Sequence, residues 1–329
     1  MLARKTAPED SASSGGEKKY ESGMAALFRK ELSDHLNSRR FYLMFALLLL
    51  ATTASLAGGI SSIVSSGGGD YVYLELFTTG SAYIYSFATF LAFLGPLAGI
   101  ALGFDAVNNE RSLGTLNRLV SQPIYRDSII NAKFLAGFAA LGVMIFALGL
   151  YVCGVGIITL GLPPQAEEIF RILTFLLLTW VYTAFWLGLS ILFSVLYRHA
   201  ATAALCAIAI WLFLSLFMSL VAGGVANLLY PTDGIQGFFN TMSNYQLNLA
   251  LNRISPYYLF SEAATTILSP SVRSIGVVTT SQLTGAVAGY LPFGQSLLLI
   301  WPHLVGMIAL TMAAFACAYI SFMRQEIRA

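Results

Sequence analysis

Residues 200–229 read AATAALCAIAIWLFLSLFMSLVAGGVANLL and contain no Lys, Arg, Asp or Glu. A helix of this length is about 45 Å long, which exceeds the roughly 30 Å hydrocarbon core of a bilayer. Five more stretches share this character: residues 41–64, 83–104, 134–160, 172–196 and 297–323. A transmembrane β-barrel would show alternation instead of continuous apolar runs. The sequence therefore predicts an all-α, polytopic membrane protein with six transmembrane helices.

The composition of the 329-residue chain supports this class. Hydrophobic residues make up 57% of it, charged residues only 10%, and the mean hydropathy is +0.73. Soluble domains carry about 25% charged residues, so a soluble enzyme is excluded. The formal net charge of +2 is too balanced to indicate a nucleic-acid-binding protein.

Two segments precede the first apolar stretch. Residues 1–23 are polar and rich in Ser, Gly, Glu and Lys, and we expect a disordered cytoplasmic tail. Residues 24–40 place Leu27, Phe28, Leu32 and Leu36 at helical spacing, which predicts an amphipathic helix lying on the membrane surface. The six-span domain then covers residues 41–329.

The positive charges predict the orientation of the spans. Counted over the tail and alternating loops, fifteen Lys and Arg fall on one side and three on the other. Cytoplasmic flanks retain positive charge, so we expect both termini and residues 105–133 in the cytoplasm. Residues 230–296 would then be extracytoplasmic. They contain two shorter helical patterns, one beginning at Ser255-Pro256 and ending before Pro270.

The chain shows no energy source or catalytic site of its own. Secondary transporters usually couple ions through charged residues inside their spans, and the predicted spans contain no Lys, Arg, Asp or Glu. It has no P-loop, no HExxH pair and no GxSxG elbow, so we predict no catalytic, cofactor or metal site.

Residues 106–134 read AVNNERSLGTLNRLVSQPIYRDSIINAKF and link the second and third spans. Leucines recur here at helical spacing until Pro123, which predicts a short amphipathic helix. Its apolar stripe fits either a linker resting on lipid headgroups or a knob that inserts into a soluble partner. The string Glu110-Arg111-x-x-Gly114-Thr115-Leu116, with Leu119-Val120, Pro123-Ile124 and Lys133, resembles the type-2 ATP-binding-cassette permease family.

The resemblance implies that this segment is a coupling helix that docks on a separate ATPase. The residues it assigns to the ATPase interface are Glu110, Arg111, Leu113, Gly114, Thr115, Leu116 and Leu119. Arg198 and His199, in the turn before the fifth span, form a candidate second cytoplasmic contact. Pro256, Tyr257, Tyr258 and Glu262 form a candidate outer gate, although Glu262 also fits a solvated residue near Arg253 or Arg273.

The expected function is that of a non-catalytic permease subunit in the plasma membrane. It would pair with a second permease half, by default another copy of this chain, and with two ATPase subunits that hold ATP and Mg²⁺. It would export an amphipathic or lipid-like substrate, since aromatic residues such as Tyr83, Tyr85 and Phe87 are frequent in its spans. Two alternatives stay open: an ATP-independent secondary transporter or channel, and a non-transporting component that transmits force to periplasmic partners.

Overall fold

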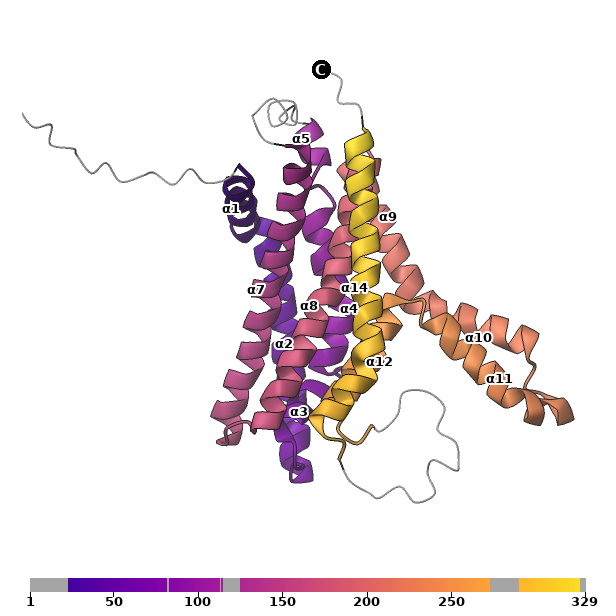
Figure 1. Cartoon of the computed structure of the whole chain (residues 1–329). Coiled ribbons are helices and arrows are strands. Elements are labelled where there is room, and N and C mark those ends of the chain that lie inside the picture. Colours follow the sequence, from indigo (N-terminus) through magenta and orange to yellow (C-terminus); the bar gives the residue numbers. More distant parts are fainter. Residues whose placement is uncertain (1–22, 82, 113, 115–124, 273–289, 326–329) are drawn as a thin grey trace, which may run out of the picture.

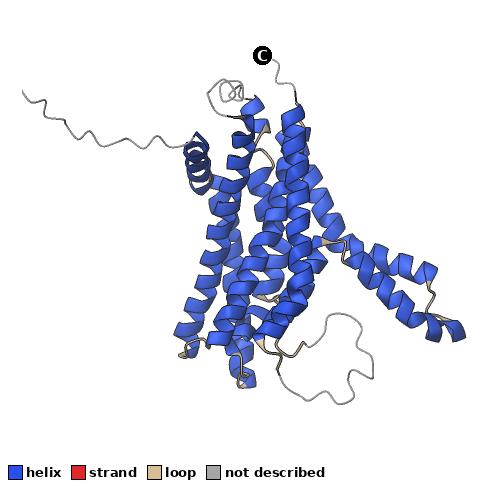
Figure 2. Ribbon diagram, in the orientation of Figure 1, coloured by secondary structure: helices blue, strands red, loops and turns tan. Residues whose placement is uncertain are grey.

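The computed structural model describes residues 23–81, 83–112, 114, 125–272 and 290–325. Within these ranges every regular element is helical (Figure 2). The predicted disordered tail lies outside them, except for Gly23. The helices are α1 (Gly23–Leu36), α2 (Arg39–Ser66), α3 (Val72–Thr78), α4 (Phe87–Gly103), α5 (Asn108–Ser112), α7 (Arg126–Leu160), α8 (Ala166–Leu196), α9 (Ala200–Leu212), the π-helix η1 (Phe213–Phe217), α10 (Met218–Leu229), α11 (Gly234–Asn252), α12 (Pro256–Leu268) and α14 (Phe293–Arg324).

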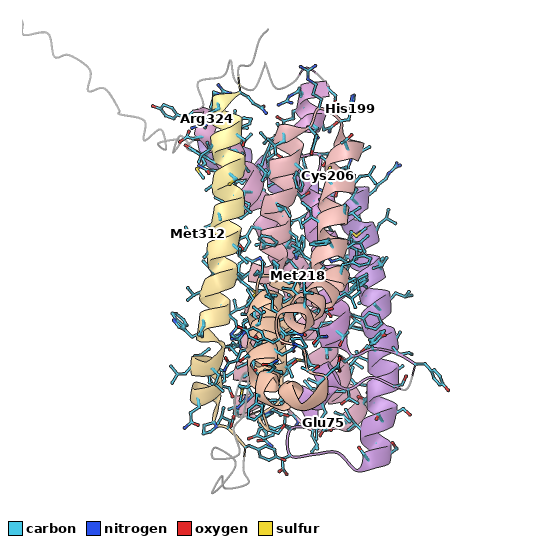
Figure 3. All side chains as sticks on the ribbon, turned by 90° about the vertical axis from the view of Figure 1, so that its right-hand side faces the viewer. Glu75, His199, Cys206, Met218, Met312 and Arg324 are labelled. Carbon is cyan, nitrogen blue, oxygen red and sulfur yellow. The ribbon has the colours of Figure 1, made fainter. Side chains whose placement is uncertain are left out.

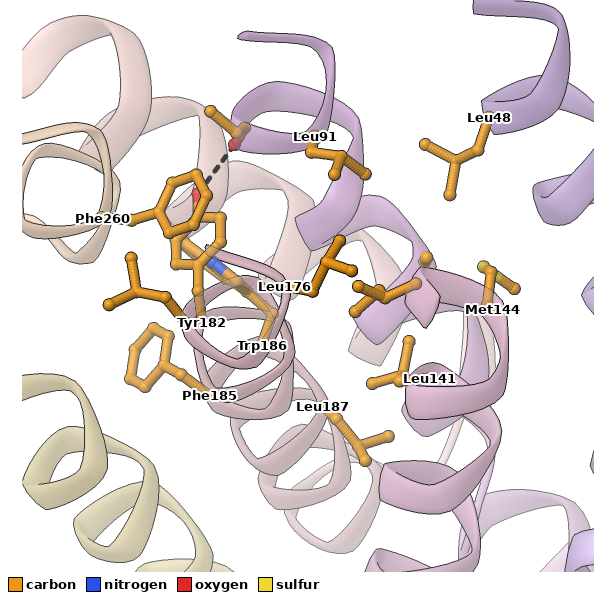
Figure 4. Close-up of a cluster of buried hydrophobic side chains, with 14 of the residues drawn as sticks. Leu48, Leu91, Leu141, Met144, Leu176, Tyr182, Phe185, Trp186, Leu187 and Phe260 are labelled. Carbon is orange, nitrogen blue, oxygen red and sulfur yellow. Dashed lines mark hydrogen bonds between the residues drawn. The ribbon is translucent and has the colours of Figure 1, made fainter. Parts of the chain in front are cut away.

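The long helices form an upright bundle with α8 at its centre (Figure 1). Helix α8 packs against α4, α7, α12 and α14, and 67% of its most apolar window is buried. In the core, the Tyr182 and Phe260 rings stack with centroids 4.4 Å apart, and the Tyr182 hydroxyl donates to the Ala92 carbonyl at 2.9 Å (Figure 4). Helices α1 and α5 and the end of α14 lie at one end of the bundle, and α3 lies at the other (Figure 1). We call these the α1 end and the α3 end.

All six predicted spans are confirmed as helices long and apolar enough to cross a membrane, but their limits differ from the apolar stretches. Helix α7 begins at Arg126 instead of residue 134, and α8 begins at Ala166 instead of residue 172. Both helices therefore include charged residues, Lys133 and Arg171, that the hydropathy pattern places outside the spans. A helix continues past its apolar stretch where partners inside the protein satisfy such charges.

The fifth span is bent. Residues 200–229 comprise α9, the π-helix η1 and α10, and the Met218 end of α10 lies about midway between the two ends of the bundle (Figure 3). From there α10 and α11 leave the bundle as a helical hairpin (Figure 1). A π-helical turn leaves a carbonyl without its usual partner, and here the Ser255 hydroxyl donates to the Leu214 carbonyl at 2.7 Å. Within the hairpin, the Asn244 amide donates to Asn227 Oδ1 at 2.7 Å.

The predicted short helices between the fifth and sixth spans are present as α11 and α12. Helix α12 begins as expected from its sequence: Ser255 is the N-cap, its hydroxyl accepts from the Tyr258 amide at 3.5 Å, and Pro256 occupies the first turn.

Glycines allow α4 to approach α8 closely. Gly95, Gly99 and Gly103 recur at four-residue spacing, and an added methyl group at each would meet α8. The space is tightest at Gly99, where a Cβ would lie 2.6 Å from the Thr183 carbonyl oxygen. On α7, Gly137, Gly142, Gly149 and Gly156 face neighbouring side chains, whereas Gly154 faces open space.

Replacing Gly99 by Ala is expected to destabilise the protein by about 1–3 kcal/mol, because the methyl group overlaps backbone atoms that cannot move freely. The matched change Gly154→Ala meets no atom within 4 Å and should be neutral or slightly stabilising, since Ala favours a helix over Gly. Thermal unfolding of the two purified variants compares them. Equal midpoints would contradict the close contact between α4 and α8.

Candidate functional site

A buried ion-pair cluster joins three helices at the α1 end. Lys133 of α7 is buried, with a side chain only 4% exposed. Its Nζ lies 3.1 Å from Glu31 Oε1 of α1 and 2.7 Å from Glu110 Oε1 of α5. We call Lys133, Glu31 and Glu110 the lysine node. Each member comes from a different helix, so the node ties the helix before the first span to the segment between the second and third spans.

The electrostatics of the node favour the ionised form of Glu31. Burial by itself would raise the pKa of Glu31, but the charge and hydrogen bond of Lys133 hold that pKa below its usual value. The ion pair between Lys133 and Glu31 is therefore expected to persist in mild acid. The lowered pKa keeps Glu31 ionised below the pH at which a free glutamate takes up a proton. Next to the node, Arg40 pairs with Asp105 and lies over the Phe104 ring, 4.9 Å from its centroid.

A groove of about 520 Å³ opens beside the node, between α1 and the end of α4. Residues of both signs line it, among them Lys30, Asp34, Arg39, Asp105 and Glu110. Its polar walls suit a protein partner that carries complementary charges better than they suit an apolar ligand.

Within the predicted coupling segment, residues 105–133, the described residues near its two ends are anchored to the ends of other helices. The Ser194 hydroxyl of α8 accepts from the backbone amides of Val107 and Asn108, at 3.0 and 3.2 Å. Arg111 donates to the Gln325 side chain, and Arg126 donates to the Gln325 carbonyl at 3.0 Å. Both ends of the segment are therefore connected to the bundle.

The structure describes three of the seven predicted ATPase-contacting residues, and each of the three has a different environment. Glu110 points into the lysine node, Arg111 reaches Gln325, and Gly114 adopts a positive φ of 67° in a turn. The remaining predicted residues, Leu113, Thr115, Leu116 and Leu119, lie outside the described residues.

Arg198 and His199, the candidate second contact, form the exposed turn between α8 and α9. Figure 3 shows His199 at the α1 end, together with Arg324. Arg198 is also close enough to Arg111 to repel its charge. The turn thus lies on the same end of the bundle as Glu110 and Arg111.

The candidate gate residues lie on α12, toward the α3 end. Glu262 accepts from Arg253 Nε at 3.0 Å and Nη2 at 2.9 Å, and it lies 2.7 Å from His303 Nε2. Its side chain is 14% exposed, so Glu262 lies near Arg253 but as an ion-paired, largely buried carboxylate, and the alternative of a solvated residue is wrong. Pro256 begins the helix, and Tyr257 and Tyr258 follow it, both half-buried.

His303, which follows Trp301-Pro302 in α14, was assigned no functional role from the sequence. Helix α14 begins at Phe293, about 15 Å along its axis before His303. The histidine is 5% exposed and contacts Glu262 from the opposite helix. No spacing in the sequence relates these two residues, because α12 and α14 are separated by a long connection.

Arg171 was also missed. It is fully buried in α8, pairs with Glu167 at 2.8 Å, and donates to the Ile267 and Leu291 carbonyls at 2.9 and 2.6 Å. These bonds fasten the end of α12 and the approach to α14 onto α8. The available signal was the Glu167–Arg171 spacing of four residues, which predicts a helix extending before the apolar stretch.

If the chain acts as the permease that its sequence resembles, replacing Glu262 by Gln is expected to slow the transport cycle without affecting assembly. The amide keeps the shape but loses the charge that holds Arg253 and His303 together. Glu75→Gln is a matched control at the same end, since Glu75 forms no ion pair within the described residues. ATP hydrolysis by the reconstituted complex measures turnover, and unchanged turnover in Glu262→Gln would assign the cluster a purely structural role.

Within the described residues, no group of three or more His, Cys, Asp or Glu side chains could hold a metal ion. The arrangement instead consists of a helical membrane bundle with an ion-paired end beside a polar groove and with short helices toward the opposite end. These features define a polytopic helical membrane protein.

The chain belongs to the ABC-2 family of transporter proteins, whose pattern it matches over residues 25–327. It is also similar to the probable ABC transporter permease protein NosY of Stutzerimonas stutzeri, with 33% identity over 153 residues. That similarity covers 44% of this chain and 52% of NosY, so the chain spans about half the length of this relative. The chain is therefore a membrane subunit of an ABC transporter.

Proposed function

We propose that this chain is the non-catalytic, membrane-spanning subunit of an ABC exporter that is driven by a separate cytoplasmic ATPase. Membership of the ABC-2 family supports the class. The observation that carries the coupling role is the lysine node, because it connects Glu110, at the start of the predicted coupling segment, to α1 and α7.

In this proposal the α1 end faces the cytoplasm and receives the ATPase. Residues 105–133 dock on the ATPase, with Leu113, Leu116 and Leu119 supplying apolar contacts and Arg111, Gly114 and Thr115 lying beside them. The polar groove and the Arg198-His199 turn lie next to this contact. ATP and Mg²⁺ bind to the partner subunit.

Movement of the ATPase would pass into the membrane through three connections. Lys133 links the segment to α7, Ser194 links it to α8, and Gln325 links it to α14. Packed helices connected in this way move by small sliding or hinge displacements. At the α3 end, α12 would respond as an outer gate, with Pro256, Tyr257 and Tyr258 at its start and Glu262 bonded across to α14.

The assembled transporter would contain two permease halves and two ATPase subunits. Two copies of this chain related by a twofold axis form the simplest such arrangement. The cargo would be amphipathic or lipid-like, and it would move outward.

The two alternatives make different use of the buried charges. A secondary transporter needs an ionisable group that gains and loses a coupling ion, but Lys133, Arg171 and Glu262 are all engaged in ion pairs. A force-transmitting component without cargo would keep the cytoplasmic coupling and lose the transport. Toward the α3 end, hydrogen bonds connect α12 to both α8 and α14, and these connections support its proposed role as a gate.

Co-purification tests the proposed class of partner. Mild-detergent extraction of the tagged chain from native membranes should recover an ABC ATPase subunit in about equal amount. Recovery of the intact chain without any ATPase would favour the secondary transporter or channel.

The orientation can be tested by labelling single cysteines with an impermeant maleimide in intact cells. In a background without Cys153, Cys206 and Cys317, a cysteine at position 66 or 281 should react, whereas one at position 13 or 121 should be protected. The charge bias of the loops is the physical reason. The opposite pattern would reverse the assignment of the two ends.

A further inference from the structure

A cavity of about 280 Å³ lies among α3, α4 and α12 toward the α3 end, away from the lysine node. Hydroxyl groups line both of its sides. Thr78, Ser86 and Thr89 belong to α3 and the start of α4, and Tyr257, Ser261 and Ser269 belong to α12 and its end. Its volume is close to the lower limit, about 300 Å³, of small-molecule sites.

The hydroxyls on the α12 side are available to a ligand. Within the described residues, the side chains of Tyr257, Ser261 and Ser269 form no hydrogen bond with another group. On the other side, the Ser86 and Thr89 hydroxyls bond to each other at 2.9 Å, and Thr78 donates to the Leu74 carbonyl at 2.9 Å. Each free hydroxyl can donate one hydrogen bond and accept others.

Among the described residues, no charged side chain lines the cavity. The nearest carboxylate along α12, Glu262, is engaged by Arg253 and His303. A charged group entering the cavity would lose water without gaining a counter-ion, which costs several kcal/mol. A neutral group with several hydroxyls would replace its bonds to water with bonds to Tyr257, Ser261 and Ser269.

The inner wall is apolar and well packed. Phe260 is fully buried and stacked on Tyr182, and Ala92 and Ala264 are 5% exposed. The carbonyl of Ala92 is already satisfied by Tyr182, so this wall offers no polar group to a ligand. It can pack against the carbon skeleton of a polyhydroxylated ring.

We infer that this cavity binds an uncharged, hydroxyl-rich group such as a sugar or polyol, either free or as the head of an amphipathic molecule. This inference rests on the proposed function, because it takes the bound group to be the transported cargo or the part of the cargo that the protein recognises. Binding to the cavity requires no ATPase, so this inference and the proposed function can fail separately. For example, the ATPase can co-purify with the chain while the cavity binds nothing.

Photolabelling of the full chain in phosphatidylcholine vesicles tests the inference. The probe is an alkyl glucoside with a photoreactive group in its alkyl chain, and the controls carry the same chain with a phosphocholine or a sulfate head. The glucoside should label α4 and α12 saturably, and neither control should compete with it. Equal labelling by all three probes would overturn the inference, because the cavity would then recognise only the alkyl chain.

Substitutions of the cavity residues test whether the labelling takes place in this cavity. The triple change Tyr257→Phe, Ser261→Ala and Ser269→Ala removes three hydrogen bonds and should weaken saturable labelling at least about tenfold. Thr159→Val is the matched control, since that hydroxyl lies on α7 and bonds to its own helix. Undiminished labelling of the triple variant would overturn the site.

Competition distinguishes the two sources of the ligand. If methyl glucoside displaces the probe as effectively as unlabelled alkyl glucoside, the site takes a free sugar from water. If only the alkyl glucoside competes, the site takes a lipid-anchored head. Both results support the inferred chemistry, whereas displacement by neither would overturn it.

Discussion

Replacing Lys133 by Ala is expected to destabilise the protein by about 3–5 kcal/mol, because it removes the buried counter-charge of Glu31 and Glu110, whose side chains are only 10% and 14% exposed. The same change should also abolish stimulation of the ATPase by the membrane chain, since it cuts the connection between α5, α1 and α7. Thermal unfolding measures the first effect, and ATP hydrolysis by the reconstituted complex measures the second.

A matched control is available one helical position from Glu31. Lys30 also lies near Glu31, at 3.5 Å, but its side chain is 56% exposed. Exposed ion pairs contribute at most about 1 kcal/mol, so Lys30→Ala should behave almost like the parent. If Lys133→Ala were no more destabilising than Lys30→Ala, the node would not be a buried structural connection.

A variant with an uncharged lysine node distinguishes the effect of the node on stability from its effect on ATPase stimulation. The triple change Lys133→Met, Glu31→Gln and Glu110→Gln removes all three charges and fills a similar volume. Replacing a buried ion pair by packed neutral groups is often close to neutral for stability. We expect stability to return in this variant while ATPase stimulation stays low, because amides and a thioether do not hold three helices in register as the ion pairs do. Full recovery of both would restrict the node to a stabilising role.

Replacing Leu116 by Asp is expected to reduce ATPase binding at least about tenfold. Burial of a leucine contributes roughly 1.5–3 kcal/mol, and 1.4 kcal/mol corresponds to a factor of ten in affinity. The introduced carboxylate adds a desolvation cost in the same interface. Co-purification with the ATPase, quantified against the parent chain, measures the loss.

Two comparisons sharpen this experiment. Leu116→Met keeps an apolar side chain of similar size and should retain the complex. Glu110→Ala should retain part of the complex but uncouple hydrolysis from transport, since Glu110 points toward Lys133. If Leu116→Asp bound the ATPase as well as Leu116→Met, the leucine stripe would not be the docking surface and a linker resting on lipid would explain it.

The membrane fold was largely predictable because its dominant signal is local. Uninterrupted apolar stretches located all six spans, and the Ser255 cap with Pro256 located the start of α12. The bend in the fifth span was not predictable from hydropathy, since residues 213–217 are as apolar as their neighbours. It depends instead on Ser255, far along the chain, bonding to the Leu214 carbonyl.

The site was predictable only where its residues lie in one segment. Glu110 and Arg111 were found from a local string, and both do lie at the same end of the bundle as the Arg198-His199 turn. Lys133 was part of that string, but its burial and its bond to Glu31 depend on α1 folding back over α7. His303 meets Glu262, and Arg171 meets the Ile267 and Leu291 carbonyls, through tertiary packing, which leaves no spacing pattern in the sequence.

The central claim, that this chain draws its energy from a docked ATPase, is tested most directly by reconstitution. The purified ATPase is assayed for ATP hydrolysis in vesicles with the parent chain, with Lys133→Ala, or without the membrane chain. The account predicts hydrolysis that rises when the parent chain is present and stays at the ATPase-only level with Lys133→Ala. Hydrolysis that is unaffected by the parent chain, together with transport in vesicles that contain no ATPase, would contradict it.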